Sequence, residues 1–365
     1  MTTFTPPPFT SEPLVSAPDA TFVAAPGDGV LPDGFFATTN LPTYVKHNGT
    51  WRLPHNPRMD GALVLDDAGE IWVREGRRVR TGDRVAIGMN EDGSEGIYVH
   101  ATGFHRPSSP NEFSFMSTVV SRERPIDYAQ MARILVEERD RRGYIVWVVG
   151  PAIVHARARA EFVWFIEHGF VHALLAGNAV AVHDIEASVF GTSLGVAASG
   201  EAAAGGHALH LRAINKVRAF GGIAPAVEGG LIKGGIMYAC VRERVPFVLG
   251  GSIRDDGPLP EVVTDVLEAQ DAMRDHCRKA TMAVMIATAL HAIATGNMLP
   301  AFVETDGALR ELPTICVDSS EFVVSKLKDR GTHQAFGVVT NAQDFLHILR
   351  ISVENELNRT SRLKR

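Results

Sequence analysis

A series of short, continuously apolar runs alternates with helix-length segments in the second part of the chain. The runs occupy residues 144–149, 171–176, 247–250, 283–287, 314–317 and 335–339. Because consecutive apolar residues suit strands that are buried on both faces, and because helices separate these strands, the pattern favours a parallel sheet covered by helices. We therefore predict an α/β domain over residues 126–358.

The preceding residues follow a different pattern. Short β-type runs alternate with Gly, Asn and Asp turns over residues 33–110, which indicates a small antiparallel barrel or sandwich. Residues 1–32 are rich in Pro, Thr and Ser and predict a disordered arm. Residues 111–125 then form a connector, and residues 359–365 a basic tail.

The composition narrows the class of protein. The net charge of −6 argues against partners such as nucleic acid and anionic membrane surfaces. The cysteines at 240, 277 and 316 are scattered and form no CxxC pair, which fits a reducing cytoplasm. No signal peptide and no membrane-length apolar run is evident, so we expect a soluble cytoplasmic protein.

Polar and small residues follow the predicted strands, and ligands of open parallel sheets bind at the carboxyl ends of the strands. Gly250-Gly251-Ser252 fits either a phosphate contact or a plain turn. Asp318 fits either a contact to a ribose diol or a helix N-cap, and one residue can do both. Arg254-Asp255-Asp256 combines an arginine that can bind an anion with two neighbouring carboxylates. Repulsion between the carboxylates raises the pKa of one of them, which favours proton transfer. The alternative is a solvent-exposed loop without a chemical role. The fingerprint GxGxxG is missing, so motif alone indicates a nicotinamide cofactor only weakly.

A second group of polar residues lies on a predicted helix over residues 179–190. His183 and Glu186 share one helix face, but only two ligands are close in sequence, so we expect no metal site. His207 and His210 are also three residues apart, and we expect no metal site there either. Histidines in such positions more commonly lie on the surface or cap a helix.

Several ordered blocks together resemble one family, the archaeal-type NAD-dependent ornithine cyclodeaminases, which were once grouped with lysine-ketoglutarate reductase/saccharopine dehydrogenase-related proteins. The same family forms the C-terminal half of bifunctional arginine dihydrolase/ornithine cyclodeaminases. The blocks are 31–35, 38–40, 115–117, 121–125, 177–186, 190–196, 206–207, 210–215, 251–260, 296–300, 316–318 and 329–331. This resemblance implies a small β-barrel followed by a Rossmann-like NAD domain. One departure is Gly61, because the family pattern usually has Cys after Met59-Asp60.

The resemblance also implies a reaction and a set of roles. L-Ornithine would give L-proline and ammonia through transient oxidation at Cα by NAD, in a lyase of proline biosynthesis. Asp255 and Asp256 are the first choices for proton transfer, with His183, Asp184 and Glu186 second. Arg254 or Arg212 would hold the substrate carboxylate, and Asn40 would help close the cleft over the substrate. The residues expected around the cofactor are Asn178, Ala179, Gly251, Ser252, Asn297, Met298, Leu299 and Asp318.

Three alternatives stay open at this point. The chain could act on another diamino acid, it could be an NAD-dependent amino-acid or imino-acid dehydrogenase with net redox change, or it could be a non-catalytic NAD or amino-acid sensor. Pockets discriminate single methylene groups only by about 1–3 kcal/mol, so sequence does not fix the substrate. An apolar helix face within 158–166 suits a homo-oligomer interface.

Overall fold

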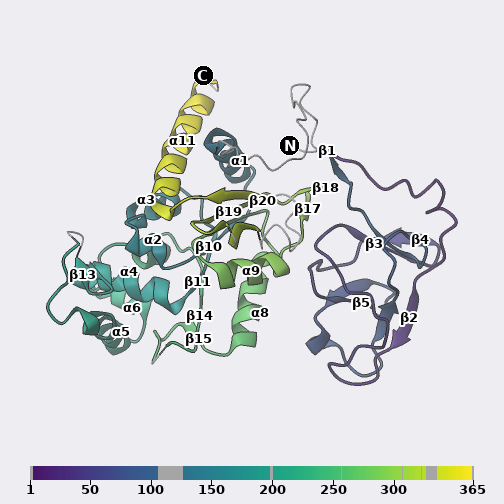
Figure 1. Cartoon of the computed structure of the whole chain (residues 1–365), viewed down its shortest axis with the longest axis horizontal. Coiled ribbons are helices and arrows are strands. Elements are labelled where there is room, and N and C mark those ends of the chain that lie inside the picture. The colour runs from purple at the N-terminus through teal and green to yellow at the C-terminus, as the bar shows by residue number, and fades with distance from the viewer. Residues whose placement is uncertain are drawn as a thin grey trace. The chain divides into compact units, whose positions relative to one another are not determined.

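The computed structural model describes residues 3–105, 126–197, 200–255, 257–305, 307–321, 323–325 and 335–363, which fall into two compact units (Figure 1). The first unit contains residues 3–105 together with 296–305 and 307–312. The second contains the other described residues. The predicted connector, 111–125, lies outside the described residues.

The first unit contains two antiparallel sheets that share a core. One sheet has the order β4-β3-β8 and the other the order β2-β7-β5-β6. Val45 and Ile97 of the first sheet pack in one buried cluster with Leu63 and Val73 of the second. The small antiparallel domain predicted from the turn spacing is confirmed. Its strands are β2 (Thr21–Ala24), β3 (Thr43–His47), β4 (Thr50–Arg52), β5 (Ala62–Leu65), β6 (Ile71–Arg74), β7 (Arg84–Ile87) and β8 (Ile97–Val99), with η1 (Gly76–Arg78) between β6 and β7.

Residues 3–32 differ from the disordered arm that their composition predicts. β1 (Thr3–Phe4) pairs with β9 (Phe104–His105), and β2 pairs with β7. The side chain of Leu14 is buried, and its carbonyl accepts a hydrogen bond of 3.1 Å from the Trp51 indole. The Lys46 ammonium donates to two further carbonyls of the arm, at 2.6 and 3.0 Å. A few anchoring side chains and backbone bonds thus offset the ordering entropy that the Pro-rich composition suggested would dominate.

A late segment belongs to the first unit, whereas the predicted boundaries assign all of 126–358 to one domain. The segment contains the antiparallel hairpin β17 (Phe302–Thr305) and β18 (Ala308–Glu311). The Ala301 N–H donates to the carbonyl of Asn40 at 2.8 Å, and the Met59 N–H donates to the carbonyl of Asn297 at 3.1 Å. These backbone bonds join residues too far apart in sequence for local patterns to reveal them.

The second unit is built on a parallel sheet with the order β15-β14-β11-β10-β16-β19-β20. Without the short edge strand β15, this is the order 3-2-1-4-5-6 of the doubly wound Rossmann fold. The predicted α/β class with a parallel sheet is therefore confirmed. The strands are β10 (Ile145–Val149), β11 (Ala173–Gly177), β14 (Phe247–Gly250), β15 (Val262–Val263), β16 (Met282–Ile286), β19 (Thr314–Asp318) and β20 (Ala335–Val339).

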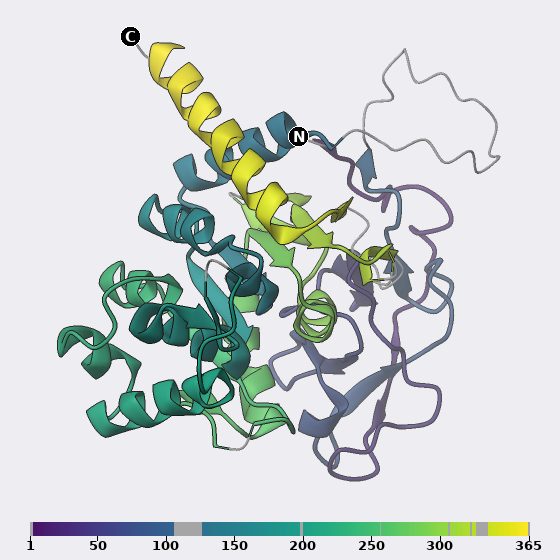
Figure 2. The same ribbon diagram turned by 60° about the vertical axis from the view of Figure 1, so that its left-hand side comes forward.

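Helices cover this sheet, and α1 lies against the long helix α11, as both views show (Figures 1 and 2). Fully buried aromatic side chains, among them Trp147, Phe162 and Phe165, fill the core between sheet and helices. The helices are α1 (Tyr128–Asp140), α2 (Ala152–His155), α3 (Arg159–Glu167), α4 (Asn178–Phe190), α5 (Leu209–Phe220), α6 (Ile223–Glu228), α7 (Ile236–Arg242), α8 (Val266–Cys277), α9 (Ala289–Met298) and α11 (Ala342–Leu363). The short elements β12 (Thr192–Ser193), β13 (Val196–Ala197) and η2 (Gly206–Ala208) lie between α4 and α5.

Two predicted helices differ from the structure. The pattern over 226–241 predicts one helix, but α6 and α7 are separate because Gly230 and Gly235 adopt positive φ angles of 74° and 109°. The pattern over 260–277 also predicts one helix, but α8 begins only at Val266, where the Asp265 side chain accepts hydrogen bonds from the N–H groups of Leu267 and Glu268.

Candidate functional site

The strand order of the second unit reverses between β10 and β16. The chain continues from β10 to β11 on one side and from β16 to β19 on the other. In open α/β sheets, ligands bind outside the carboxyl ends of the strands at such a switch point. Gly150 follows β10 there, and a β-carbon on this residue would lie 1.8 Å from the carbonyl oxygen of Ala287, which follows β16. Only glycine therefore fits this backbone at the switch point.

Beside the switch point, a hydrogen-bonded cluster joins the ends of β11 and β14. The Asn178 amide donates to one carboxylate oxygen of Asp255 at 2.9 Å, and the other oxygen accepts from the Ser252 N–H at 2.8 Å. The amide oxygen of Asn178 accepts from the Leu259 N–H at 3.2 Å. The structure thus brings together three of the predicted site residues. Both oxygens of Asp255 are engaged in shaping the loop after β14.

Other predicted residues lie along the same edge. The Gly251 N–H donates to the carbonyl of Val263 at 2.9 Å, and Ala179 occupies the first turn of α4. Arg254 is exposed on the loop after β14, and its neighbour Asp256 lies outside the described residues. Asp318 ends β19, where one carboxylate oxygen accepts from the Ser320 N–H at 2.9 Å.

Asp184, one of the second choices for proton transfer, links three helices of this fold. Its carboxylate is fully buried and accepts hydrogen bonds from the N–H groups of Ile236 and Met237 at 2.9 and 2.8 Å, at the start of α7. The Arg159 guanidinium also donates to it, at 2.5 Å. All of these partners belong to the protein, so they hold α3, α4 and α7 together.

Glu186 is also fully buried and holds the turn that follows α4. Its carboxylate accepts from the Thr192 hydroxyl at 2.9 Å and from the N–H groups of Leu194 and Gly195 at 3.1 and 2.8 Å. The His183 ring lies 3.5 Å from the same carboxylate.

The His183 ring also packs against His155, with 4.6 Å between the ring centroids. Burial, followed by repulsion between the two histidines, lowers the pKa of His155, and burial lowers the pKa of His183. Because lowered pKa values favour the neutral rings, this pair carries no charge at neutral pH.

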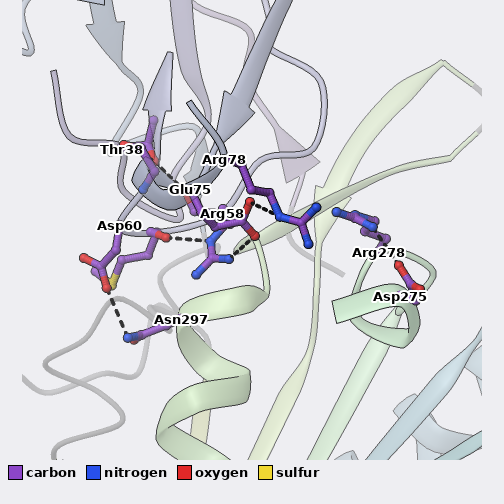
Figure 3. Close-up of polar contacts among 10 residues, drawn as sticks. Thr38, Arg58, Asp60, Glu75, Arg78, Asp275, Arg278 and Asn297 are labelled. Carbon is purple, nitrogen blue, oxygen red and sulfur yellow. Dashed lines mark hydrogen bonds and ion pairs between the residues drawn. The ribbon is translucent and has the colours of Figure 1, made fainter. Parts of the chain in front are cut away.

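Three residues predicted to contact the cofactor, Asn297, Met298 and Leu299, belong to the first unit. The Asn297 amide donates to the Asp60 carboxylate at 3.1 Å, while its own buried amide oxygen has no partner among the described residues (Figure 3). Asp60 has a left-handed backbone with φ 58°, and its N–H donates to the carbonyl of Thr38 at 3.0 Å.

Arg58 of the same loop forms a mostly buried ion pair with Glu75, which follows β6, and donates to its carboxylate at 2.6 Å (Figure 3). The side chains of the predicted residues Met298, Leu299 and Asn40 are almost fully buried. Arg212, the other candidate for the substrate carboxylate, is exposed on α5 of the second unit.

One residue that sequence reasoning missed is His291, on α9. Its imidazole lies at the carboxyl ends of β11 and β14, beside Gly177 and Gly250. The only signal in the sequence is a single histidine inside the apolar run 281–294.

No group of His, Cys, Asp and Glu side chains within the described ranges is arranged to hold a metal ion. The same part of the chain has no helix that is long and apolar enough to cross a membrane.

The sheet order and the glycine at the switch point define a Rossmann-fold protein of the doubly wound α/β class. Residues 129–349 match the model for the Rossmann fold of the C-terminal part of ArgZ-like arginine dihydrolases, and residues 42–129 match the first region of that part. The chain belongs to this family, which includes the archaeal ornithine cyclodeaminases.

Named relatives support this assignment. The chain is 47% identical over 328 residues to the ornithine cyclodeaminase of Methanopyrus kandleri, which covers 88% of this chain and 75% of the relative. A conserved LOR/SDH protein of Methanococcus maripaludis has a similar structure, with a TM-score of 0.83, 41% identity and coverage of 93% of this chain and 99% of that chain. The ternary complex of AgrE with ornithine and NAD⁺ has a TM-score of 0.60 and 37% identity, and the match covers 94% of this chain and 47% of AgrE.

Proposed function

We propose that this protein is an NAD-dependent ornithine cyclodeaminase that converts L-ornithine to L-proline and ammonia. The observation that carries the proposal is the 47% identity to a named ornithine cyclodeaminase, over 88% of this chain and 75% of the relative. The complex of the related AgrE with ornithine and NAD⁺ supports both the substrate class and the cofactor.

The residues at the carboxyl edge fit NAD. At Gly150 and Gly251 a β-carbon would crowd the backbone of Ala287 and of Thr264, so glycine keeps the chain closely packed at the switch point and at the end of β14, where ligands of this fold bind. Asp318 keeps one carboxylate oxygen without a partner among the described residues, and this oxygen can accept a hydrogen bond from a ribose hydroxyl. When bound, NAD⁺ would take the hydride from Cα of the substrate and return it to the cyclic product precursor.

The chain itself would bind the substrate and move its protons. Arg254 has an exposed guanidinium, with no partner in the described part of the chain, that can bind a carboxylate through two parallel hydrogen bonds. Asp255 has both oxygens engaged and positions the loop, so we assign proton transfer to its neighbour Asp256. Of the helix carboxylates, we give Asp184 and Glu186 supporting roles because both are fully buried and already accept several hydrogen bonds from neighbouring protein groups.

The test is incubation of the purified protein with L-ornithine and a substoichiometric amount of NAD⁺. The proposal predicts one proline and one ammonia for each ornithine consumed, with no accumulating NADH. A dehydrogenase would instead build up one NADH per turnover, and a sensor would bind without turnover. Lysine and 2,4-diaminobutyrate in parallel reactions identify the preferred chain length.

The Asp256→Asn variant tests the proton-transfer role. It should lose turnover while it retains the NAD affinity of the wild type, because the substitution removes only the ionisable oxygen. Full turnover in this variant would transfer the role to another group.

We further propose that the protein is a cytoplasmic homo-oligomer of proline biosynthesis. Light scattering coupled to size-exclusion chromatography measures the oligomeric state directly. A monomer at micromolar concentration would contradict that part of the proposal.

A further inference from the structure

The His291 imidazole occupies space that two strand-end glycines leave open. A β-carbon at Gly177, the last residue of β11, would lie 3.0 Å from Cε1 of His291, and one at Gly250, the last residue of β14, would lie 3.5 Å from Nε2. The first separation is tighter than an ordinary van der Waals contact. Glycine at position 177 therefore gives the ring its place over the carboxyl edge of the sheet.

The ring is half-buried, yet neither of its nitrogens has a hydrogen-bond partner among the described residues. Burial lowers the pKa of His291, so the neutral ring, with one donor and one acceptor, prevails at neutral pH. Neither nitrogen is among the buried polar atoms that lack a partner in the described part of the chain, so water reaches both of them. The ring therefore offers a free donor and a free acceptor to a ligand at this edge of the sheet.

The position of the ring indicates which part of a dinucleotide is close. β11 is the second strand of the Rossmann order, and in dinucleotide-binding members of this fold an acidic residue about 20 residues after the first strand–helix turn binds the 2′-hydroxyl of the ribose. This chain has Gly177-Asn178 at the end of β11. The Asn178 side chain is bonded to Asp255 and to the Leu259 N–H, and it carries no carboxylate that could take the place of the acidic residue.

We propose that His291 binds the 2′-hydroxyl of the adenosine ribose of NAD and so takes the place of the acidic residue. The proposal rests on the proposed function for the identity of the cofactor. It adds a recognition residue that comes from α9, after the fourth strand of the Rossmann order, and reaches the ends of the second and third strands.

The test measures dissociation constants by titration calorimetry for NAD⁺, for ADP-ribose and for NAD⁺ with 2′-deoxyadenosine in place of adenosine. ADP-ribose lacks nicotinamide, so its affinity reports on the adenosine half without any turnover. His291→Leu keeps most of the side-chain volume but removes both polar nitrogens. His291→Gln keeps a donor and an acceptor and serves as the variant that restores function.

His172→Leu is the control for general destabilisation, because His172 is also half-buried and accepts a hydrogen bond of 3.1 Å from the Ile145 N–H, but precedes β11 and so lies at the opposite end of that strand. The loss of one neutral hydrogen bond predicts a dissociation constant about 3- to 10-fold higher for NAD⁺ and ADP-ribose in His291→Leu. The wild type should bind the 2′-deoxy analogue more weakly by a similar factor, and His291→Leu should bind NAD⁺ and the analogue equally. His291→Gln should recover part of the affinity, and His172→Leu should match the wild type.

Two results would overturn the inference. One is equal affinity for NAD⁺ and ADP-ribose in the wild type and in both His291 variants. The other is a wild type that binds no NAD⁺, which would also defeat the proposed function. A wild type that binds NAD⁺ through His291 but does not turn over ornithine would contradict the proposed activity alone.

Discussion

Gly150 and Ala287 approach each other so closely at the switch point that a β-carbon at 150 would lie 1.8 Å from the Ala287 carbonyl oxygen. Because the obstructing atom belongs to the backbone, a rotamer change cannot relieve the clash. We expect Gly150→Ala to shift the ends of β10 and β16, to lower the melting temperature and to weaken NAD binding. Overpacking of this kind typically costs about 1–3 kcal/mol. Calorimetric unfolding and NAD titration measure both effects.

Gly234→Ala is the control for this prediction. Gly234 belongs to the same unit, and a β-carbon there would meet no atom within 4 Å. This variant should unfold at the temperature of the wild type or slightly above it. Equal stability and NAD affinity in the two variants would show that the switch point tolerates a side chain.

Asn178 should control the mobility of the loop after β14. Asn178→Ala removes the bonds to the Asp255 carboxylate and the Leu259 N–H, and each buried group left without a partner costs about 1–3 kcal/mol. We expect faster amide hydrogen exchange in the loop that begins at Gly251, together with weaker NAD binding. Asn341→Ala breaks a comparable Asn–Asp bond to Asp344 at the start of α11 and should leave this loop unchanged. Unaltered exchange in Asn178→Ala would disprove the bracing role.

Gly61 and Val73 should depend on each other. A β-carbon at Gly61 would lie 2.4 Å from Cγ1 of Val73 and 3.1 Å from the Thr38 hydroxyl oxygen, so the Val73 side chain fills the space that a cysteine at 61 would need. Gly61→Cys alone should therefore lower the melting temperature, and adding Val73→Ala should recover part of the loss. A double-mutant cycle, in which thermal unfolding of the wild type, the two single variants and the double variant is compared, measures the coupling. Strict additivity would rule out a direct clash.

Histidine protonation should weaken the fold at mildly acidic pH. Burial lowers the pKa values of His155, His172, His183 and His291 below the ordinary value of 6.5. Between these lowered pKa values and about 6.5 the unfolded chain binds more protons than the native chain, so stability falls as pH falls through this window. Melting temperatures measured from pH 8 down to pH 5 should decline below about pH 6.5. A flat profile over this range would contradict the burial of these rings.

The strands and the fold class were accessible from sequence because their signals are local. Four or five consecutive apolar residues identify β10, β14 and β20 almost to the residue, and the ordered family blocks identify the Rossmann arrangement. The boundaries of α6 and α7 could not be predicted in the same way. Gly230 and Gly235, which separate the two helices, have positive φ angles, and the Ile236 N–H at the start of α7 donates to the distant Asp184 carboxylate.

The site was accessible only in part, for a similar reason. The strand-end rule predicts that Asn178, Ser252 and Asp255 share one edge, but it cannot show that they are bonded to one another. The positions of Asp184 and Glu186 on one helix suggested a catalytic role. In the structure their carboxylates accept hydrogen bonds from the N–H groups of Met237 and Gly195, which lie outside that helix and could not be identified from helical spacing. His291 carried no motif at all. Its significance depends on two glycines from other strands.

The path of the chain between the two units has a consequence for biosynthesis. The first part of the first unit ends at Arg124, and this unit receives β17 and β18 only once the ribosome has passed residue 311, after most of the second unit has been made. The hydrogen bonds from Met59 to Asn297 and from Ala301 to Asn40 each span more than half the chain, so they close large loops late. Until that point the N-terminal sheets lack the segment that supplies these backbone partners, and incompletely assembled sheets of this kind are prone to aggregate.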